Sequence, residues 1–348
     1  MKFFFKFSII VFLIFFACKK PSSILDLSNN EIHIYHEQLA IEDTLLHDID
    51  EIALLDSLLF VIDETEHFYF ALFNIKTDSL MFRFGTKGNG PGELMWPLFI
   101  ECNKQNNAFV VSAINPVGYM YYSIDSLIAN PNSYTPGILK IKKRDDNFIY
   151  TVNRLNDSLY IGKGQLKDGQ FAIINKAGEI ISIQEKYPVG DEVELYNQVE
   201  LGSTYQGEIT TKPESNKFAY VSIVGSILEV CEVKEDLLIE KIKTYYFNYP
   251  QIVSSNNRTA LVKENIIGYK NLYSTKNYFY ILYSELGMME MMGNAFIFNT
   301  ILVFDWNGKL VKKLKTDINL RTFAVSEDDK IIYGTTANPY PTIVKFNL

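Results

Sequence analysis

The chain is poor in the residues that form nucleophilic and metal centres. Its 348 residues contain only 3 cysteines and 4 histidines. No histidine lies beyond residue 67, since the four are His33, His36, His47 and His67. No G-x-S-x-G motif occurs, and a Ser-His-Asp triad would have to take its histidine from this first part of the chain. A metal site with three histidines from segments spread along the chain is excluded.

Basic charge and long apolar runs are also scarce. Lysine and arginine number 33 against 41 Asp and Glu, which gives a net charge of −8 and an isoelectric point near 5.2. The one dense basic stretch is the short KIKKR at 140–144. Nucleic acid is therefore excluded as a partner, because neutralising its phosphates requires a basic face. The apolar run at Phe7–Ala17 is shorter than the roughly 20 residues that span a bilayer.

The N-terminus has the form of a secretory signal. Lys2 and Lys6 precede the apolar run, and Cys18 follows it directly. This arrangement resembles a bacterial lipoprotein signal, in which the cysteine is acylated and the chain is cut just before it. The resemblance implies a signal peptide over 1–17, a lipid-anchored tether over 18–30 and a folded domain over 31–348. The alternative is an ordinary secreted protein with Cys18 as a free thiol.

What the sequence does contain is a long series of β-type segments. Val, Ile, Phe and Tyr dominate runs such as LLFVID, AFVVSAI, KFAYVSIV and ILVFDW, which are separated by Asn, Asp, Gly, Lys and Pro. Many short strands at about ten-residue spacing predict a sandwich, a barrel or a propeller. Cys102 and Cys231 fall in two separate runs, so we expect two buried thiols rather than a disulfide.

Internal repetition favours the propeller. A strand–turn–strand unit occurs as LFNIKTDSLMFRF at 72–84, as QFAIINKAGEIISI at 170–183 and as VFDWNGKLVKKL at 303–314. A unit of roughly 40 to 50 residues with four strands is a propeller blade, and about 315 residues hold six of them. We therefore predict an all-β propeller of six blades with four antiparallel strands each, and seven blades are the alternative.

The stretch FGTKGNGPGEL at 84–94 raises the question of a phosphate site, because it combines four glycines with a proline. A phosphate-binding loop needs its glycines followed by Lys and Ser or Thr at the start of a helix. Here Lys87 precedes Gly88, Pro91 has no amide hydrogen, and further strand patterns follow. The stretch is therefore interpreted as a turn.

The same stretch resembles the glycine-rich sequence that joins consecutive blades in NHL-type propellers. The preceding LFVIDETEHFYFALFNI resembles the strand that carries Val and Asp, here Asp63, in those repeats. With the N-terminal signal and the VFDWNG unit, the chain resembles the six-bladed, TolB-like propeller lipoproteins of Bacteroidetes, the BF-type family of unassigned function. The resemblance implies a fold and a compartment but no chemistry.

In a propeller this stretch would carry the chain from the outer strand of one blade to the inner strand of the next. Glycines allow positive φ and close backbone approach, and proline fixes one φ between them. The residues given this structural role are Gly85, Gly88, Gly90, Pro91 and Gly92. The polar residues of the crossing are candidates for ligand contact, namely Lys87, Asn89 and Glu93.

Carboxylates are plentiful, but no spacing singles out a general acid and a general base. They include Asp63, Glu64, Glu93 and Asp305. Calcium-dependent propeller hydrolases use carboxylates with Asn along the central channel, so a divalent-metal hydrolase or lyase with calcium is the alternative function. The main interpretation expects no catalytic residue, no metal and no cofactor.

A methionine cluster, GMMEMMGN at 287–294, lies between two strand patterns. Thioethers bind Cu(I), but such a cluster also forms an adaptable apolar loop that packs on a neighbour or on a partner. Three interpretations stay open: loop packing, a flexible binding surface and a copper site. The residues concerned are Met288, Met289, Met291 and Met292.

These observations predict a lipid-anchored β-propeller that acts as a binding module rather than as an enzyme. Its expected partners are the membrane, through lipid on Cys18, and a protein, peptide or glycan ligand. The KKPSS that follows Cys18 lacks the acidic run of surface-exported lipoproteins, which favours a periplasm-facing protein in the outer membrane of a Gram-negative bacterium. A ring of carboxylate or Asn side chains converging in the channel would favour the hydrolase, and an aromatic or Met-rich rim would favour binding.

The two ends of the chain are expected to meet. A propeller avoids a free sheet edge when a strand from one terminus completes a blade that the other terminus builds. We expect Glu31–Gln38 to join the last blade beside Thr342–Leu348.

Overall fold

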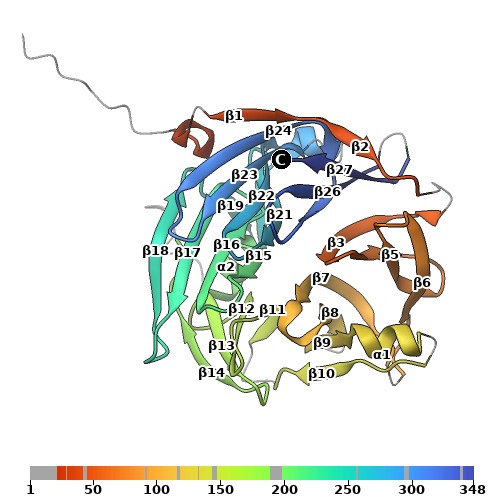
Figure 1. Cartoon of the computed structure of the whole chain (residues 1–348). Coiled ribbons are helices and arrows are strands. Elements are labelled where there is room, and N and C mark those ends of the chain that lie inside the picture. Colours follow the sequence, from red (N-terminus) through yellow and green to blue (C-terminus); the bar gives the residue numbers. More distant parts are fainter. Residues whose placement is uncertain are drawn as a thin grey trace, which may run out of the picture.

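Six antiparallel sheets surround a central axis in the computed structural model (Figure 1). The structure describes residues 22–28, 30–41, 45–90, 92–115, 118–131, 133–142, 147–188, 198–255, 258–293, 298–337 and 340–348. The predicted all-β propeller with six blades is confirmed, and the alternative of seven blades is wrong. The predicted signal peptide and Cys18 lie outside the described residues.

The strands of each blade follow one another from the central axis to the rim. Blade 1 contains β3 (Ile49–Leu55), β4 (Leu58–Asp63), β5 (Phe68–Asn74) and β6 (Ser79–Thr86). Blade 2 contains β7 (Met95–Asn103), β8 (Ala108–Asn115), β9 (Gly118–Ser123) and β10 (Gly137–Lys140). Blade 3 contains β11 (Phe148–Arg154), β12 (Leu159–Gln165), β13 (Phe171–Asn175) and β14 (Ile180–Gln184).

The second half of the disc repeats this order and adds a hairpin. Blade 4 contains β15 (Gly207–Thr211), β16 (Lys217–Ser222), β17 (Ile227–Val233) and β18 (Ile239–Tyr246). The hairpin of β19 (Ile252–Ser255) and β20 (Arg258–Leu261) follows it. Blade 5 contains β21 (Ile266–Ser274), β22 (Tyr278–Gly287), β23 (Phe298–Asp305) and β24 (Leu310–Leu320). Blade 6 contains β25 (Thr322–Val325), β26 (Ile331–Thr336) and β27 (Thr342–Asn347).

Helices are short and lie between strands. They are η1 (Ile24–Leu27), η3 (Lys104–Asn106), α1 (Ile124–Ala129), α2 (Gln198–Thr204) and α3 (Met288–Gly293). None of the helices in the described ranges is long and apolar enough to cross a membrane.

The three repeated units of the sequence occupy equivalent places. They form the outer hairpins of blades 1, 3 and 5, which are β5–β6, β13–β14 and β23–β24. In each turn a side-chain oxygen accepts a hydrogen bond from the amide two residues later, and the acceptors are Asn74, Asn175 and Asp305. This is the turn that Asn and Asp favour. The repeated sequence therefore encodes one turn geometry used three times.

Hydrophobic clusters fill the spaces between neighbouring blades. Each of the six interfaces has one cluster of buried side chains within the described residues. Between blades 1 and 2 the cluster is aromatic, with the Phe60 ring centroid 4.7 Å from that of Phe109 and 5.0 Å from that of Phe70. Aromatic pairs at these separations contribute beyond the area they bury. Blade-to-blade packing is thus the main apolar contact of the fold.

The N-terminal strand closes the disc in two steps. β2 (His36–Gln38) pairs antiparallel with β27 and is the fourth strand of blade 6, which confirms the predicted meeting of the two ends. β1 (Glu31–Ile34) instead pairs parallel with β24 as a fifth strand of blade 5. The segment expected to form one strand therefore serves two blades.

The folded part of the chain begins earlier than expected. Ile24, within the segment assigned to a tether over 18–30, is fully buried in the cluster between blades 4 and 5. The Ser23 hydroxyl caps the helical turn by accepting a hydrogen bond from the Leu25 amide at 3.0 Å. Ile24 and the residues beside it thus pack on the disc ahead of Glu31.

The glycine-rich stretch joins β6 to β7, as predicted for a blade crossing. φ is positive at Gly85, Gly88 and Gly92; at Gly90 a Cβ would instead lie 2.9 Å from a Glu93 carboxylate oxygen, and Pro91 lies outside the described residues. At Gly85 a side chain would be excluded, because its Cβ would lie 2.2 Å from the Phe70 ring. The crossing therefore depends on specific glycines.

Deleting Glu31–Gln38 should lower the melting temperature by at least about 5 °C, because the deletion leaves the edges of β24 and β27 unpaired. Calorimetry or thermal denaturation followed by circular dichroism measures the change. Glu37→Ala keeps the strand and removes only an exposed ion pair with Lys345, so it should melt within about 1 °C of wild type. A deletion variant that melts like wild type would contradict this role of β1 and β2.

Candidate functional site

A cavity of about 730 Å³ lies at the centre of the disc. Side chains from the innermost strands of all six blades line it, together with the loops that follow these strands. It therefore opens where the innermost strands end, a side that we call the mouth face. The side where these strands begin is called the opposite face.

Side chains on the innermost strands bond to the backbone of the next blade. A Glu51 carboxylate oxygen accepts from the Ile100 amide at 3.2 Å, joining blade 1 to blade 2. Glu208 accepts from the Leu272 amide at 2.8 Å, joining blade 4 to blade 5. The Asn271 side-chain oxygen accepts from the Phe323 amide at 3.2 Å, joining blade 5 to blade 6. Amides at the channel edge of these sheets are thereby satisfied.

The other junctions use related contacts. Glu101 of blade 2 accepts from Asn153 of blade 3 at 3.0 Å and from the Tyr119 hydroxyl at 2.6 Å. Arg321, just before β25, forms ion pairs with Asp48, just before β3, and with Asp50 in β3, which joins blade 6 to blade 1. Polar contacts between blades thus extend around much of the channel.

Burial raises the pKa of all three cavity glutamates. For Glu208 it raises the pKa to about 8, and for Glu101 it outweighs the hydrogen bonds that favour the charged form. For Glu51 burial is the largest cause and the charge of Glu208 adds to it, so the pKa lies well above its usual range. Two carboxyl groups that repel each other across the cavity hold protons more tightly than free ones do.

Charges at the mouth face are paired with one another. Lys104 lies in ion-pair contact with Glu327, Arg154 with Asp157, and Lys276 lies 3.3 Å from Glu214. By contrast, none of the ion pairs between described residues includes Glu51, Glu101 or Glu208. Positive charge nevertheless acts on them, since Lys270 lowers the pKa of Glu51 and Glu208 and Arg154 lowers that of Glu101, but burial outweighs both. No group of three or more His, Cys, Asp or Glu in that part could hold a metal ion.

The two cysteines behave as separate thiols. Cys231 is buried and Cys102 half-buried, and they form no disulfide, as expected. Cys102 lines the cavity with its sulfur 3.8 Å from the Tyr273 hydroxyl oxygen. Burial raises the pKa of Cys102 to about 11, so the thiol stays protonated at neutral pH and is a poor nucleophile.

The polar residues predicted from the glycine-rich stretch lie together, on the opposite face and away from the cavity. Lys87 forms an ion pair with Glu64 at 2.6 Å and lies 5.0 Å from the centroid of the Tyr69 ring. Glu93 accepts a hydrogen bond from the Gly90 amide at 2.7 Å within the loop. Asn89 is exposed and accepts from Asn115 at 2.6 Å. Lys87 and Glu93 are thus engaged within the protein.

The methionine cluster forms α3 at the end of β22, also on the opposite face. Met288 is half-buried, and Met291 packs against the cluster between blades 5 and 6. Met289 is 57% exposed. The side chain of Met292 lies outside the described part. The structure therefore separates these residues from the cavity.

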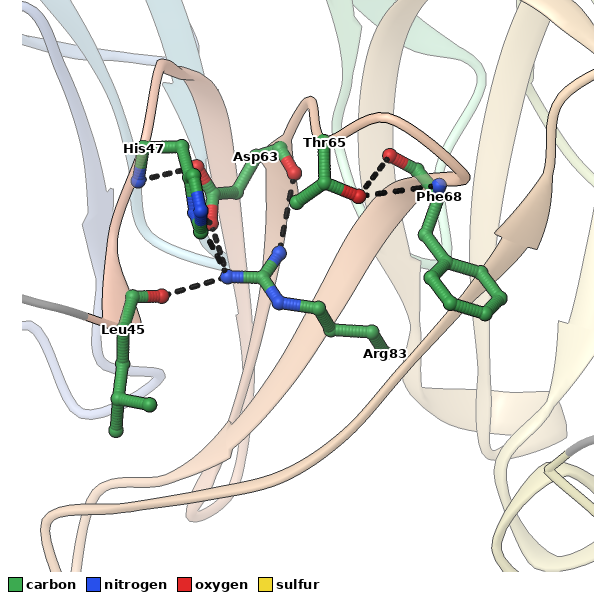
Figure 2. Close-up of polar contacts among 6 residues, drawn as sticks. All are labelled: Leu45, His47, Asp63, Thr65, Phe68 and Arg83. Carbon is green, nitrogen blue, oxygen red and sulfur yellow. Dashed lines mark hydrogen bonds and ion pairs between the residues drawn. The ribbon is translucent and has the colours of Figure 1, made fainter.

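The aspartate of the repeat-like segment has a structural role. Figure 2 shows Asp63 at the centre of a cluster, where Arg83 donates to its carboxylate at 2.6 Å and the His47 amide donates at 2.8 Å. Arg83 also donates to the Leu45 carbonyl at 2.6 Å. Asp63 is fully buried. This network attaches the segment before β3 to β6, the outermost strand of blade 1.

A second buried charge lies between blades 3 and 4. The Lys163 nitrogen is 4.2 Å from the ring centroid of Tyr220 and 4.7 Å from that of Tyr187, and it has no hydrogen-bond partner among the described residues. Burial lowers the pKa of Lys163 to about 7. Because Lys163 does not line the cavity, we assign it to packing between blades.

Sequence reasoning missed the residues that line the cavity. Glu51, Glu101 and Glu208 each stand in an apolar strand, in IDEIALL, FIECN and GEITT. A carboxylate inside the first strand of a blade was the available signal. It could be used only after the first strand of each blade had been identified.

Glu208→Gln should change how stability depends on pH. The folded-state pKa of Glu208 is raised to about 8 from 4.5, so its contribution to stability is present below pH 4.5 and is lost as the pH rises to 8. The variant should therefore gain about 1 to 3 kcal/mol relative to wild type between these pH values. Urea denaturation at pH 5, 6, 7 and 8 measures the difference. Glu240→Gln removes an exposed carboxylate from the rim of blade 4 and serves as the control; equal pH profiles for both variants would contradict the prediction.

Comparisons with known proteins agree with this architecture. Residues 30–328 match the family model described as TolB-like 6-blade propeller-like. A DUF4221 family member from Bacteroides vulgatus is similar in structure, with 13% identity, a TM-score of 0.54 and coverage of 92% of this chain and 98% of that chain. The Cps50 (Swd1) β-propeller domain from Myceliophteria thermophila has 8% identity, a TM-score of 0.50 and coverage of 86% and 83%.

At these identities the two structures show the fold alone, and no curated protein matches the chain. The family match covers most of the residues and agrees with the six blades observed. The chain therefore belongs to the TolB-like six-blade propeller family.

Proposed function

We propose that this protein is a binding module whose ligand enters the central cavity from the mouth face. The observation that carries the proposal is the cavity of about 730 Å³ lined by all six blades. Ligand sites of proteins are commonly concave and of about 300 to 1,000 Å³, with a few polar groups among apolar ones. The wall combines apolar residues such as Ile209 and Leu272 with a larger number of polar ones, among them Glu208 and Thr210.

The charges of the wall favour a basic peptide among the ligand classes considered. Glu51 and Glu208 each use one carboxylate oxygen for a backbone amide, and the other oxygen has no hydrogen-bond partner among the described residues. A buried carboxylate with an unbonded oxygen is complementary to an ammonium or guanidinium group, and burial outweighs the effect of Lys270 on the pKa of both glutamates. A lysine or arginine side chain, or a free amino terminus, supplies that group.

The proposed location of the module is the periplasmic side of the outer membrane of a Gram-negative bacterium, with lipid on Cys18. The lipoprotein-like signal at the N-terminus supports it, together with the absence of an acidic run after Cys18. Acyl chains on one cysteine anchor a protein when more than one chain is attached. The BF-type lipoproteins of Bacteroidetes are the subfamily that this arrangement resembles.

One observation favours the alternative of a divalent-metal hydrolase or lyase. Glu51, Glu101, Glu208 and Asn153 all line the cavity, and oxygen ligands of this kind suit calcium. Each side chain is, however, bonded to the neighbouring blade rather than grouped with the others. We therefore retain the binding module as the function and include calcium in its test.

A trilysine peptide should bind to the purified protein, and a triglutamate peptide of the same length should not. Glu51→Gln and Glu208→Gln should each weaken trilysine binding about tenfold or more, because each removes a charge-assisted contact. Affinity should also rise as the pH increases toward 8, since binding requires Glu208 to lose its proton. Isothermal titration calorimetry measures both effects.

Glu240→Gln is the matched control, because it removes one exposed charge outside the cavity and should leave binding unchanged. Calcium titrated in place of the peptide gives the second arm. Calcium binding that Glu208→Gln abolishes, without any binding of trilysine, would favour the hydrolase alternative. Preference for a neutral oligosaccharide would contradict the choice of a basic peptide.

Cys18→Ala should release the protein from membranes, because the thiol is the proposed site of acylation. Fractionation of cells that express either form, followed by immunoblotting, measures the distribution. Intact cells treated with protease should keep the wild-type protein whole if it faces the periplasm. A Cys18→Ala variant that is processed and membrane-bound like wild type would exclude the lipid anchor.

A further inference from the structure

The opposite face displays large apolar side chains at several loops and strand starts. The innermost strands begin on this face. Trp96 lies near the start of β7 and Phe148 at the start of β11, and both side chains are exposed. Tyr340 precedes β27 on the same face and is 65% exposed. The hairpin and loop between blades 4 and 5 add Tyr249, Val253 and Leu261, and α3 adds Met289.

The hairpin and α3 are held together at their bases by one buried residue. The Asn265 side chain accepts from the Gln251 amide at 2.7 Å and donates to the Val262 carbonyl at 2.9 Å, which closes the base of β19–β20. The Asn265 carbonyl accepts from the Met288 amide at 2.7 Å. The exposed Val253 and Met289 therefore project from one braced unit, and an apolar side chain so held costs free energy in water.

Trp96 is held outward on a strained backbone. Its φ of 55° is positive, which is uncommon for a residue with a large side chain, and its indole is 57% exposed. The Trp96 amide lies 3.5 Å from the Tyr69 hydroxyl, and Pro97 follows it. Strain kept at an exposed tryptophan indicates a role for the ring outside the fold.

The described chain starts at the same side of the disc. The Ser23 hydroxyl donates to Glu285, close to the end of β22 and to the start of α3. Only three residues lie between Cys18 and Ser22, so four residue steps connect them, and a fully extended chain spans at most about 3.6 Å per step. A lipid attached at Cys18 would thus enter the bilayer within about 15 Å of Ser22.

We propose that the opposite face docks on the lipid surface that holds the acyl chains of Cys18, so that the cavity mouth points away from the membrane. Tryptophan and tyrosine favour the interface between lipid and water, where the ring is buried and its polar atom stays hydrated. A docked apolar face supplies a second attachment besides the lipid chains. The mouth face carries ion pairs around the cavity, such as Lys276 with Glu214. This inference rests on the proposed anchor at Cys18.

The two tryptophans of the chain make the proposal testable with native probes. Trp306 is buried and donates to the Thr275 carbonyl, so it reports the interior, whereas Trp96 reports the opposite face. Lipidated wild-type protein is reconstituted in vesicles of phosphatidylethanolamine and phosphatidylglycerol, with and without brominated acyl chains. The signal of Trp96 is the part of the fluorescence that Trp96→Phe removes.

Brominated chains should quench the Trp96 signal, and quenching by iodide should fall about threefold or more relative to Cys18→Ala protein in solution. Leu238→Trp in the Trp96→Phe protein places a tryptophan at the exposed turn between β17 and β18 on the mouth face. That tryptophan should stay as accessible to iodide on vesicles as in solution.

The outcomes separate the inference from the anchor on which it rests. If the protein sediments with vesicles while Trp96 stays open to iodide and unquenched by bromine, the anchor stands and the docked orientation is wrong. If the tryptophan at position 238 is quenched instead, the disc is docked by its mouth face. If the lipidated protein does not sediment with vesicles, the anchor and the docking both fail.

Discussion

The architecture depends on hydrogen bonds that run from the innermost strand of one blade to the backbone of the next. An innermost strand has a partner strand on one side only, so its other edge would present unpaired amides to the channel. Glu51, Glu208 and Asn271 satisfy such amides across three of the six junctions. Apolar clusters between the blades bury most of the side chains. Hydrophobic contact is not directional, so it does not fix how far one blade is shifted along the central axis relative to the next. The polar contacts fix that shift, and they do so at the wall of the central cavity.

The chemistry of the cavity follows from this structural use of carboxylates. A glutamate that bonds to a backbone amide inside the disc is removed from water, and its pKa rises because the charged form loses hydration. The cavity thereby acquires acidic groups whose burial outweighs the charge of Lys270, while the charges at its mouth form ion pairs with one another. An interior of this kind attracts a cation and resists an anion. Binding a basic peptide is the function that uses these groups as the fold already places them.

The two faces of the disc divide the remaining roles. The ends of the innermost strands and the loops that follow them surround the cavity on the mouth face, whereas crossings between blades, the hairpin β19–β20 and α3 lie on the opposite face. The described segment around Ile24 packs between blades 4 and 5, so the described chain begins at a defined position on the disc. An anchor at Cys18 would then act on an oriented body rather than on a freely rotating one. With the anchor and the apolar face on the membrane side, a ligand would reach the cavity from the side that points away from the membrane.

The sequence alone determined the fold class, the blade number and the outer hairpins, because these depend on local signals. Alternating apolar residues specify strands, and Asn74, Asn175 and Asp305 specify one turn in three blades. The cavity was decided by tertiary structure. Glu51 and Glu208 are 157 residues apart (208 − 51) and interact only because closure of the disc brings blades 1 and 4 to a common axis. The division of Glu31–Gln38 between two blades and the burial of Ile24 have the same origin. Partners far apart in the chain leave no periodic trace in the sequence, since their contact depends on how whole blades pack.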